Sequence, residues 1–173
     1  MSLERYIRTV PDWPKKGISF KDITPLLKDG KVFRAAIQGL ARPFKRKTID
    51  AVAGIDARGF LLAGAMAQEL HCGVAIVRKK GKLPWKRVRQ SYALEYGMAT
   101  LEMHRDAVRK GERILIVDDI LATGGTLGAA IKLIEKLGGI VVGISVLGTL
   151  DFLPGAVRIA KKYPLHSLIH FDS

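Results

Sequence analysis

The chain has 173 residues, 48% of them hydrophobic and 26% charged, which is the size and composition of one globular domain with a single core. Its only cysteine, Cys72, excludes an intrachain disulfide and a cysteine-cluster metal site. With 29 Lys and Arg against 16 Asp and Glu, the net charge of +13 predicts a surface that attracts nucleic acid, anionic membranes or phosphorylated small molecules.

Apolar strands and helical patterns alternate along the chain, which predicts an α/β fold with a central, mostly parallel sheet flanked by helices. The predicted helices are 32–44, 59–70 and 124–137, and the predicted strands are 51–55, 73–77, 114–117 and 140–147, with a short edge strand at 166–171. Between the strands at 73–77 and 114–117, Ala99, Leu101 and Met103 alternate with polar residues, as in a small antiparallel excursion or mobile flap.

The sequence offers no segment suited to a membrane. Its longest apolar stretch, residues 140–150, is interrupted by Gly143 and Gly148 and is shorter than the roughly 20 residues that a span requires. The first ten residues lack an apolar signal core. We therefore expect a cytoplasmic protein.

The string ILIVDDILATGGT, residues 114–126, combines a buried strand, two acids and a turn of small residues. In parallel α/β sheets ligands bind beyond the carboxyl ends of the strands. Gly124 and Gly125 permit positive φ and close backbone approach, so consecutive N–H groups and the start of the next helix can surround an anion. Residues 122–126 thus predict a phosphate cup. It differs from a P-loop, because no G-x-x-x-x-G-K-[ST] string is present.

Asp118 and Asp119 precede the phosphate cup and would repel a bare phosphate, so they are expected to face sugar hydroxyls or hydrated magnesium. A phosphate followed by a diol is the order of groups in a 5-phosphoribosyl unit. The alternative is structural: Asp119 caps the turn and the glycines make a tight connection between strand and helix.

This string resembles the phosphoribosyl-pyrophosphate (PRPP) motif of type I phosphoribosyltransferases. The resemblance extends from residue 10 to residue 150 and follows the adenine branch of that family in order and spacing. It implies a type I phosphoribosyltransferase fold in a single domain of residues 1–173, with an N-terminal hood at about 1–30 and a flexible lid at about 91–106. The further segments that carry it are VPDWPKKGISFKDITPLLKD (10–29), AGIDARGFLLAGAMAQEL (53–70), RKKGKLP (78–84) and SYALEYGMATLEMHRDAV (91–108).

The resemblance also implies a role for individual residues. A non-proline cis peptide is implied beside Arg58, whose position after a strand places its guanidinium on the side of the phosphate cup. Glu95 is the implied catalytic proton handler, with Tyr96 at the lid tip, although a loop glutamate can also be plain solvated charge. The implied contacts are Ala122, Thr123, Gly124, Gly125 and Thr126 with the 5-phosphate, Asp118 and Asp119 with ribose and Mg²⁺, Arg58, Lys79 and Lys82 with pyrophosphate, and Ile18, Phe20, Lys21 and Leu150 with the base.

Some features keep a second interpretation. The basic arm, residues 78–89, holds seven cations and could instead be a solvated loop or a nucleic-acid patch. Trp85 and Thr149 depart from the family pattern, and Phe20 could belong to the core. His166 and His170 could face the same side as a metal pair, but no carboxylate motif accompanies them.

The expected function is transfer of the 5-phosphoribosyl group from PRPP to N9 of adenine, giving AMP and pyrophosphate. Mg²⁺ is expected to be held through PRPP rather than by a protein-only site, and the resemblance implies a homodimer. The alternatives are transfer to hypoxanthine, guanine or xanthine, and a PRPP-sensing regulator that binds nucleic acid. The lack of a preceding winged-helix domain and the presence of Glu95 favour an enzyme, so neither nucleic acid nor a membrane is an expected partner.

Overall fold

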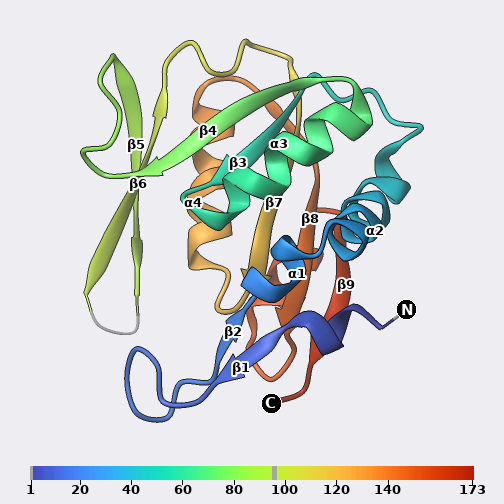
Figure 1. Cartoon of the computed structure of the whole chain (residues 1–173). Coiled ribbons are helices and arrows are strands. Elements are labelled where there is room, and N and C mark those ends of the chain that lie inside the picture. The colour runs from blue at the N-terminus through green and yellow to red at the C-terminus, as the bar shows by residue number, and fades with distance from the viewer. Residues whose placement is uncertain (1, 95–96) are drawn as a thin grey trace.

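The computed structural model describes residues 2–94 and 97–173, within which seven strands form one sheet in the order β5-β6-β4-β3-β7-β8-β9 (Figure 1). Neighbouring strands from β4 to β9 run parallel, whereas β6 pairs antiparallel with both β4 and β5. The strands are β3 (Ala51–Ile55), β4 (Gly73–Lys79), β5 (Arg87–Ala93), β6 (Met98–His104), β7 (Arg113–Leu121), β8 (Ile140–Leu150) and β9 (Leu165–Phe171).

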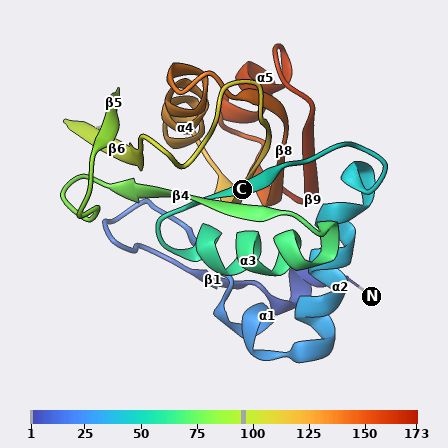
Figure 2. The same cartoon turned by 90° about the horizontal axis from the view of Figure 1, so that it is seen from above.

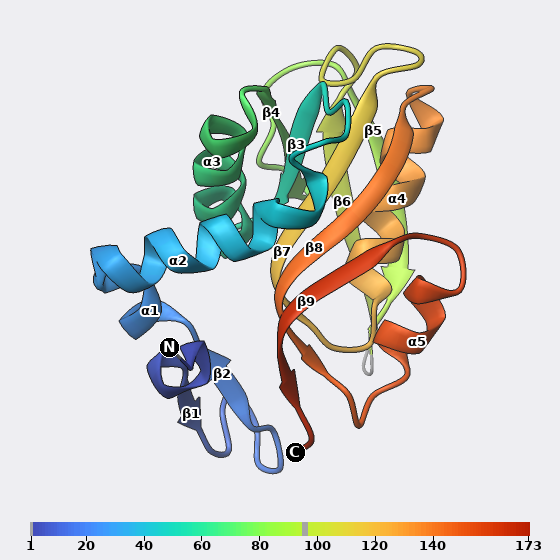
Figure 3. The ribbon, with the colours of Figure 1, turned by 90° about the vertical axis from the view of Figure 1, so that its right-hand side faces the viewer.

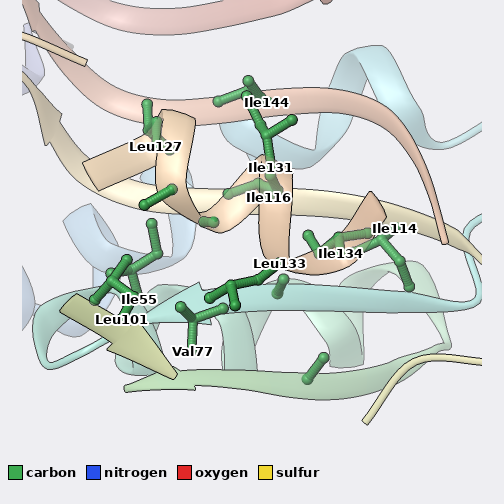
Figure 4. Close-up of a cluster of buried hydrophobic side chains, with 14 of the residues drawn as sticks. Ile55, Val77, Leu101, Ile114, Ile116, Leu127, Ile131, Leu133, Ile134 and Ile144 are labelled. Carbon is green, nitrogen blue, oxygen red and sulfur yellow. The ribbon is translucent and has the colours of Figure 1, made fainter. Parts of the chain in front are cut away.

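Helices cover both faces of this sheet, as Figure 2 shows from above. One face packs against α2 (Gly30–Ala41) and α3 (Arg58–Leu70), and the other against α4 (Gly125–Lys136), with α5 (Gly155–Ala160) beside it. Alternate residues of the buried strands therefore enter different clusters: on β7, Leu115 belongs to the cluster of Leu62 from α3, whereas Ile116 belongs to that of Ile131 from α4. Figure 4 shows the second cluster. Each such buried aliphatic side chain stabilises the fold by about 1.5–3 kcal/mol.

The N-terminal residues form the hood, a small unit at the carboxyl end of β7. It contains the 3₁₀ helix η1 (Leu3–Tyr6), an antiparallel pair of β1 (Arg8–Val10) and β2 (Phe20–Asp22), and the short α1 (Thr24–Lys28). The hood lies beside the C-terminal end of β9 (Figure 3). Asp29 is the N-cap of α2, where its carboxylate accepts hydrogen bonds from the N–H groups of Lys31 and Val32.

The predicted elements are confirmed with shifted ends. The helix predicted at 32–44 divides into α2 and a 3₁₀ turn, η2 (Arg42–Phe44). Strand β7 continues four residues beyond its predicted end, because Asp118, Ile120 and Leu121 still pair with β8. The predicted excursion is the antiparallel β5–β6 hairpin, here called the ribbon, and the tail adds β9 at the sheet edge. None of the described helices has the length and apolar character needed to cross a membrane.

Candidate active site

The predicted site residues come from loops and strand ends on one side of the sheet. The phosphate cup follows β7, Arg58 follows β3, and the basic arm begins in the last two residues of β4. Because β4, β3 and β7 are parallel neighbours, their carboxyl ends meet at one edge. The hood and the C-terminal end of β5 lie at the same end of the sheet (Figure 1).

Asp118 and Asp119 stand near the end of β7, where the first turn of α3 approaches the strand. A side-chain carbon at Gly59 would lie 3.0 Å from Asp118 Oδ1, so the absence of a side chain there makes room for the carboxylate. The same oxygen accepts a hydrogen bond from the N–H of Asp119 at 3.0 Å. Burial, and then the neighbouring Asp119, raise the pKa of Asp118 well above its usual range. This site therefore favours a partner that supplies positive charge or donates hydrogen bonds.

Arg58 pairs with the second of these acids. Its Nε lies 2.6 Å from Oδ2 of Asp119, which is almost fully buried. The contact is an ion pair without hydrogen-bond alignment, so within the described part of the chain this oxygen accepts no hydrogen bond and keeps its acceptor capacity. The peptide between Asp56 and Ala57 is cis, as the family resemblance implied.

The phosphate cup forms the entry to α4. Gly124 is the N-cap residue of α4 and has a φ of +79°, a backbone conformation that residue types other than glycine rarely adopt. No side chain caps the N–H groups at this end of the helix. The first-turn N–H groups of α4 and its positive dipole end therefore suit a phosphate. The Tyr92 hydroxyl lies 3.3 Å from that of Thr126, so the ribbon touches the cup. Tyr92 was not among the predicted site residues, because its position in the lid segment gives no sign of this contact.

Some cations of the basic arm form ion pairs with carboxylates, and others do not. Arg78 pairs with Asp56 at 3.3 Å, and Arg87 and Arg89 both contact Oε1 of Glu102, at 3.2 and 2.7 Å. No carboxylate within the described residues pairs with the side chains of the predicted pyrophosphate ligands, Lys79 and Lys82.

Glu102, on the ribbon, was also missed by the sequence analysis, because alternation marks its strand but not its partners. Its carboxylate is inaccessible to solvent and also accepts the N–H of Gly81, at 3.0 Å. Burial by itself would raise the pKa of Glu102, but the Gly81 N–H and then Arg89 and Arg87 outweigh it and hold the pKa below its ordinary value.

The predicted base ligands lie in the hood and at the end of β8. The Phe20 ring is 4.8 Å from the Arg58 guanidinium carbon, which joins the hood to the sheet side of the site. Ile18 is exposed, and Leu150 is half-buried at the last position of β8. The Lys21 side chain donates a hydrogen bond to the main-chain oxygen of Ser173 at 3.0 Å.

The remaining predicted or ambiguous residues separate in space. Thr149 is buried with its hydroxyl 3.1 Å from Nδ1 of His170, whereas Nε2 of His166 lies 3.1 Å from the Gly39 carbonyl oxygen. The two histidines therefore contact different groups rather than a common ligand position. Among the described residues, no three His, Cys, Asp or Glu gather as a metal site. Glu95 and Tyr96 lie outside the described residues.

Known proteins match this chain in sequence and in structure. A family model described as the phosphoribosyl transferase domain matches residues 24–149. The adenine phosphoribosyltransferase of Brachyspira hyodysenteriae is 53% identical over 171 residues, covering 99% of this chain and 100% of that protein.

Solved structures agree with this match. The crystal structure of adenine phosphoribosyltransferase from Rhodothermus marinus has a TM-score of 0.94 at 48% identity, covering 98% of this chain and 96% of that one. The enzyme from Saccharomyces cerevisiae, crystallised with an imino-altritol bisphosphate and adenine, has a TM-score of 0.89 at 33% identity over 95% of each chain. The order of strands, the cup after β7 and these matches show that this chain belongs to the phosphoribosyltransferase family, in its adenine phosphoribosyltransferase branch.

Proposed function

We propose that this chain transfers the 5-phosphoribosyl group of PRPP to N9 of adenine, releasing pyrophosphate and forming AMP. The observation that carries the proposal is the Asp118-Asp119 pair at the end of β7, followed at once by an uncapped helix start that suits a phosphate. That order of groups corresponds to the diol and 5-phosphate of one ribosyl unit. The adenine-bound yeast relative supports the choice of base.

The proposed mechanism is positioning and charge stabilisation. Residues 122–126 bind the 5-phosphate, Asp118 and Asp119 receive the ribose hydroxyls, and Arg58 with Lys79 and Lys82 stabilise the leaving pyrophosphate. The described residues of the site are rich in groups that bind anions and offer no activated nucleophile. This favours a dissociative displacement with oxocarbenium-like character at C1 and no covalent intermediate on the enzyme.

The donor set fits Mg²⁺ bound together with PRPP. The carboxylates of Asp118 and Asp119 are the hard oxygen ligands that this ion prefers, and Oδ2 of Asp119 is buried without an aligned hydrogen bond in the described part of the chain. When bound, the metal neutralises charge on pyrophosphate. The two carboxylates orient the ribose hydroxyls, and Arg58 limits the repulsion between Asp119 and the phosphates.

On the base side, we propose that Phe20 stacks on the purine, that Leu150 closes the opposite side, and that main-chain groups from Ile18 to Lys21 bind its edge. Adenine must lose a proton overall as N9 bonds to C1. Glu95, with Tyr96 beside it, stays the predicted group for that proton. Transfer to hypoxanthine, guanine or xanthine is less favoured, because the compared relatives are adenine enzymes. The same comparison disfavours a nucleic-acid-binding regulator.

We also propose a homodimer. Leu61 on α3 and Val74 and Ile76 on β4 are 44–55% exposed, although they belong to core elements. Val74 pairs in register with the buried Val52, so it lies on the face that α3 covers, at the side where that cover ends. A second copy would bury this apolar surface close to the basic arm. A cytoplasmic location stays a prediction from sequence.

One competition assay tests the proposed reaction and its base. The purified chain is incubated with PRPP, Mg²⁺ and an equimolar mixture of adenine, hypoxanthine, guanine and xanthine, and nucleotides and pyrophosphate are measured chromatographically. We expect AMP and pyrophosphate in equal amounts. Formation of IMP, GMP or XMP instead would move the assignment to another base. No pyrophosphate with any purine, together with salt-sensitive RNA or DNA binding, would overturn the enzyme assignment.

A further inference from the structure

The phosphate cup rests on the first residues of α5. A side-chain carbon at Gly155 would overlap the carbonyl oxygen of Ala122 and lie 2.8 Å from the Gly124 nitrogen. One at Gly124 would lie 3.3 Å from the Gly155 Cα. The two backbones therefore meet directly, and a glycine on each side makes that approach possible. The back of the cup is thus built by a helix that follows β8.

Arg158, one turn along α5, binds this junction. Its Nη2 donates a hydrogen bond of 2.7 Å to the carbonyl oxygen of Thr123. Hydrogen bonds from a charged donor are roughly twice as strong as those between neutral groups. Within the described residues no carboxylate forms an ion pair with Arg158, so this carbonyl is its principal partner.

The bond has a consequence for the opposite side of the same peptide. In a trans peptide the C=O and the following N–H point in opposite directions. With the Thr123 carbonyl turned toward α5, the Gly124 N–H faces away from α5, on the side where the 5-phosphate is proposed to bind. Rotation of this peptide would present a carbonyl oxygen to the phosphate and replace attraction by repulsion.

We propose that Arg158 is a positioning residue, which acts through the Thr123–Gly124 peptide to keep the phosphate cup in its anion-binding orientation. The inference rests on the proposed role of residues 122–126 as the 5-phosphate site. It adds a residue outside the sequence motif, 35 positions from its partner. Arg158 affects the half of the reaction that involves the 5-phosphate, and leaves pyrophosphate and base contacts to other groups.

Steady-state kinetics of Arg158→Ala and Arg158→Lys test the proposal. We expect the KM for PRPP to rise about tenfold in Arg158→Ala, the size of a lost charged hydrogen bond, and less in Arg158→Lys. The KM for adenine should stay within about twofold. Product inhibition separates the subsites: inhibition by AMP, which carries the 5-phosphate, should weaken in parallel, whereas inhibition by pyrophosphate should not.

Chemical rescue gives a readout that a merely structural role would not move. Because Arg158 is exposed, guanidinium ions from solution can reach the Thr123 carbonyl in Arg158→Ala, and low millimolar guanidinium should restore part of the PRPP affinity. Lys161→Ala removes a neighbouring exposed cation and serves as the matched control; its KM for PRPP should equal that of the unchanged chain.

Thr126→Val, which removes a hydroxyl from the cup itself, separates two failures. If it weakens PRPP binding while Arg158→Ala does not, the positioning role is overturned and the cup stands. If both leave the KM for PRPP unchanged, the cup assignment fails as well. An equal rise in the KM for adenine and for PRPP in Arg158→Ala, without guanidinium rescue, would also overturn the proposal, since it indicates a general loss of structure.

Discussion

Asp118 and Asp119 place two carboxylates side by side in a chain with a net charge of +13. Their surroundings explain this: Arg58 balances Asp119 at 2.6 Å, and burial raises the pKa of Asp118 because water is excluded from its charged form. Such a pair is costly without a ligand and becomes favourable when hydroxyl groups or a cation arrive. At this scale the acids fit their proposed role, which is to receive the uncharged hydroxyl groups of an otherwise anionic substrate.

We therefore expect Asp118→Asn combined with Asp119→Asn to weaken PRPP binding about a hundredfold and to leave adenine binding nearly unchanged. The amides keep the shape of the carboxylates, but each offers one acceptor oxygen instead of two and carries no charge to attract a metal ion. Isothermal titration calorimetry with each substrate checks this. Unchanged PRPP affinity in the double variant would refute the assignment of these residues to the ribose.

At the level of secondary-structure elements, Glu102 connects the ribbon to the basic arm. Its carboxylate binds the Gly81 N–H in the arm and Arg87 and Arg89 at the start of β5. These bonds fix the turn that carries the proposed pyrophosphate ligands Lys79 and Lys82. Arg87 and Arg89 are themselves paired with Glu102, so the proposed pyrophosphate ligands are the two lysines of this anchored turn.

Glu102→Gln should lower the free energy of unfolding by about 1–3 kcal/mol at pH 7, since a buried charged network loses its acceptor charge. The pKa of Glu102 is lowered in the folded state, so its stabilisation is present above the ordinary value of 4.5 and is lost as pH falls through the folded value. Urea unfolding from pH 7 down to pH 3 should show the difference from the unchanged chain shrinking. The exposed Glu4→Gln is the control, and a pH-independent difference would contradict this role.

For the whole molecule, the arrangement of layers leaves one apolar region uncovered where α3 ends its coverage of β4. Leu61 and Ile76 are 55% and 44% exposed there, whereas every residue of the neighbouring strand β3 is buried. Because β4 is followed by the basic arm, a subunit interface at this position would lie next to the site. Dimerisation and the geometry of pyrophosphate binding would then be linked.

Replacement of Leu61 and Ile76 by lysine should convert the proposed dimer to a monomer, because two buried cations would face their symmetry mates. Light scattering after size-exclusion chromatography measures the mass directly. Ile140→Lys, at a similarly exposed residue at the start of β8, should leave the mass unchanged. A double variant that keeps the mass of the unchanged chain would place any interface elsewhere.

Local pattern was sufficient for much of this molecule. The sequence alone determined the alternation of strands and helices, because side-chain periodicity reports which face is buried. It also predicted the phosphate cup, because the acids, glycines and threonines proposed to act together are contiguous between Asp118 and Thr126. The family resemblance added Arg58, Phe20 and the two lysines of the basic arm as an ordered set.

Only the tertiary structure decided which distant groups meet. Arg58 and Asp119 pair because β3 and β7 are neighbours in the sheet, and Arg158 reaches Thr123 because α5 returns to the back of the cup. Lys21 turns to Ser173 for the same kind of reason, since the hood lies beside β9. Periodicity describes one element at a time, whereas these contacts depend on strand order and on where each connection returns, and residue spacing does not record either.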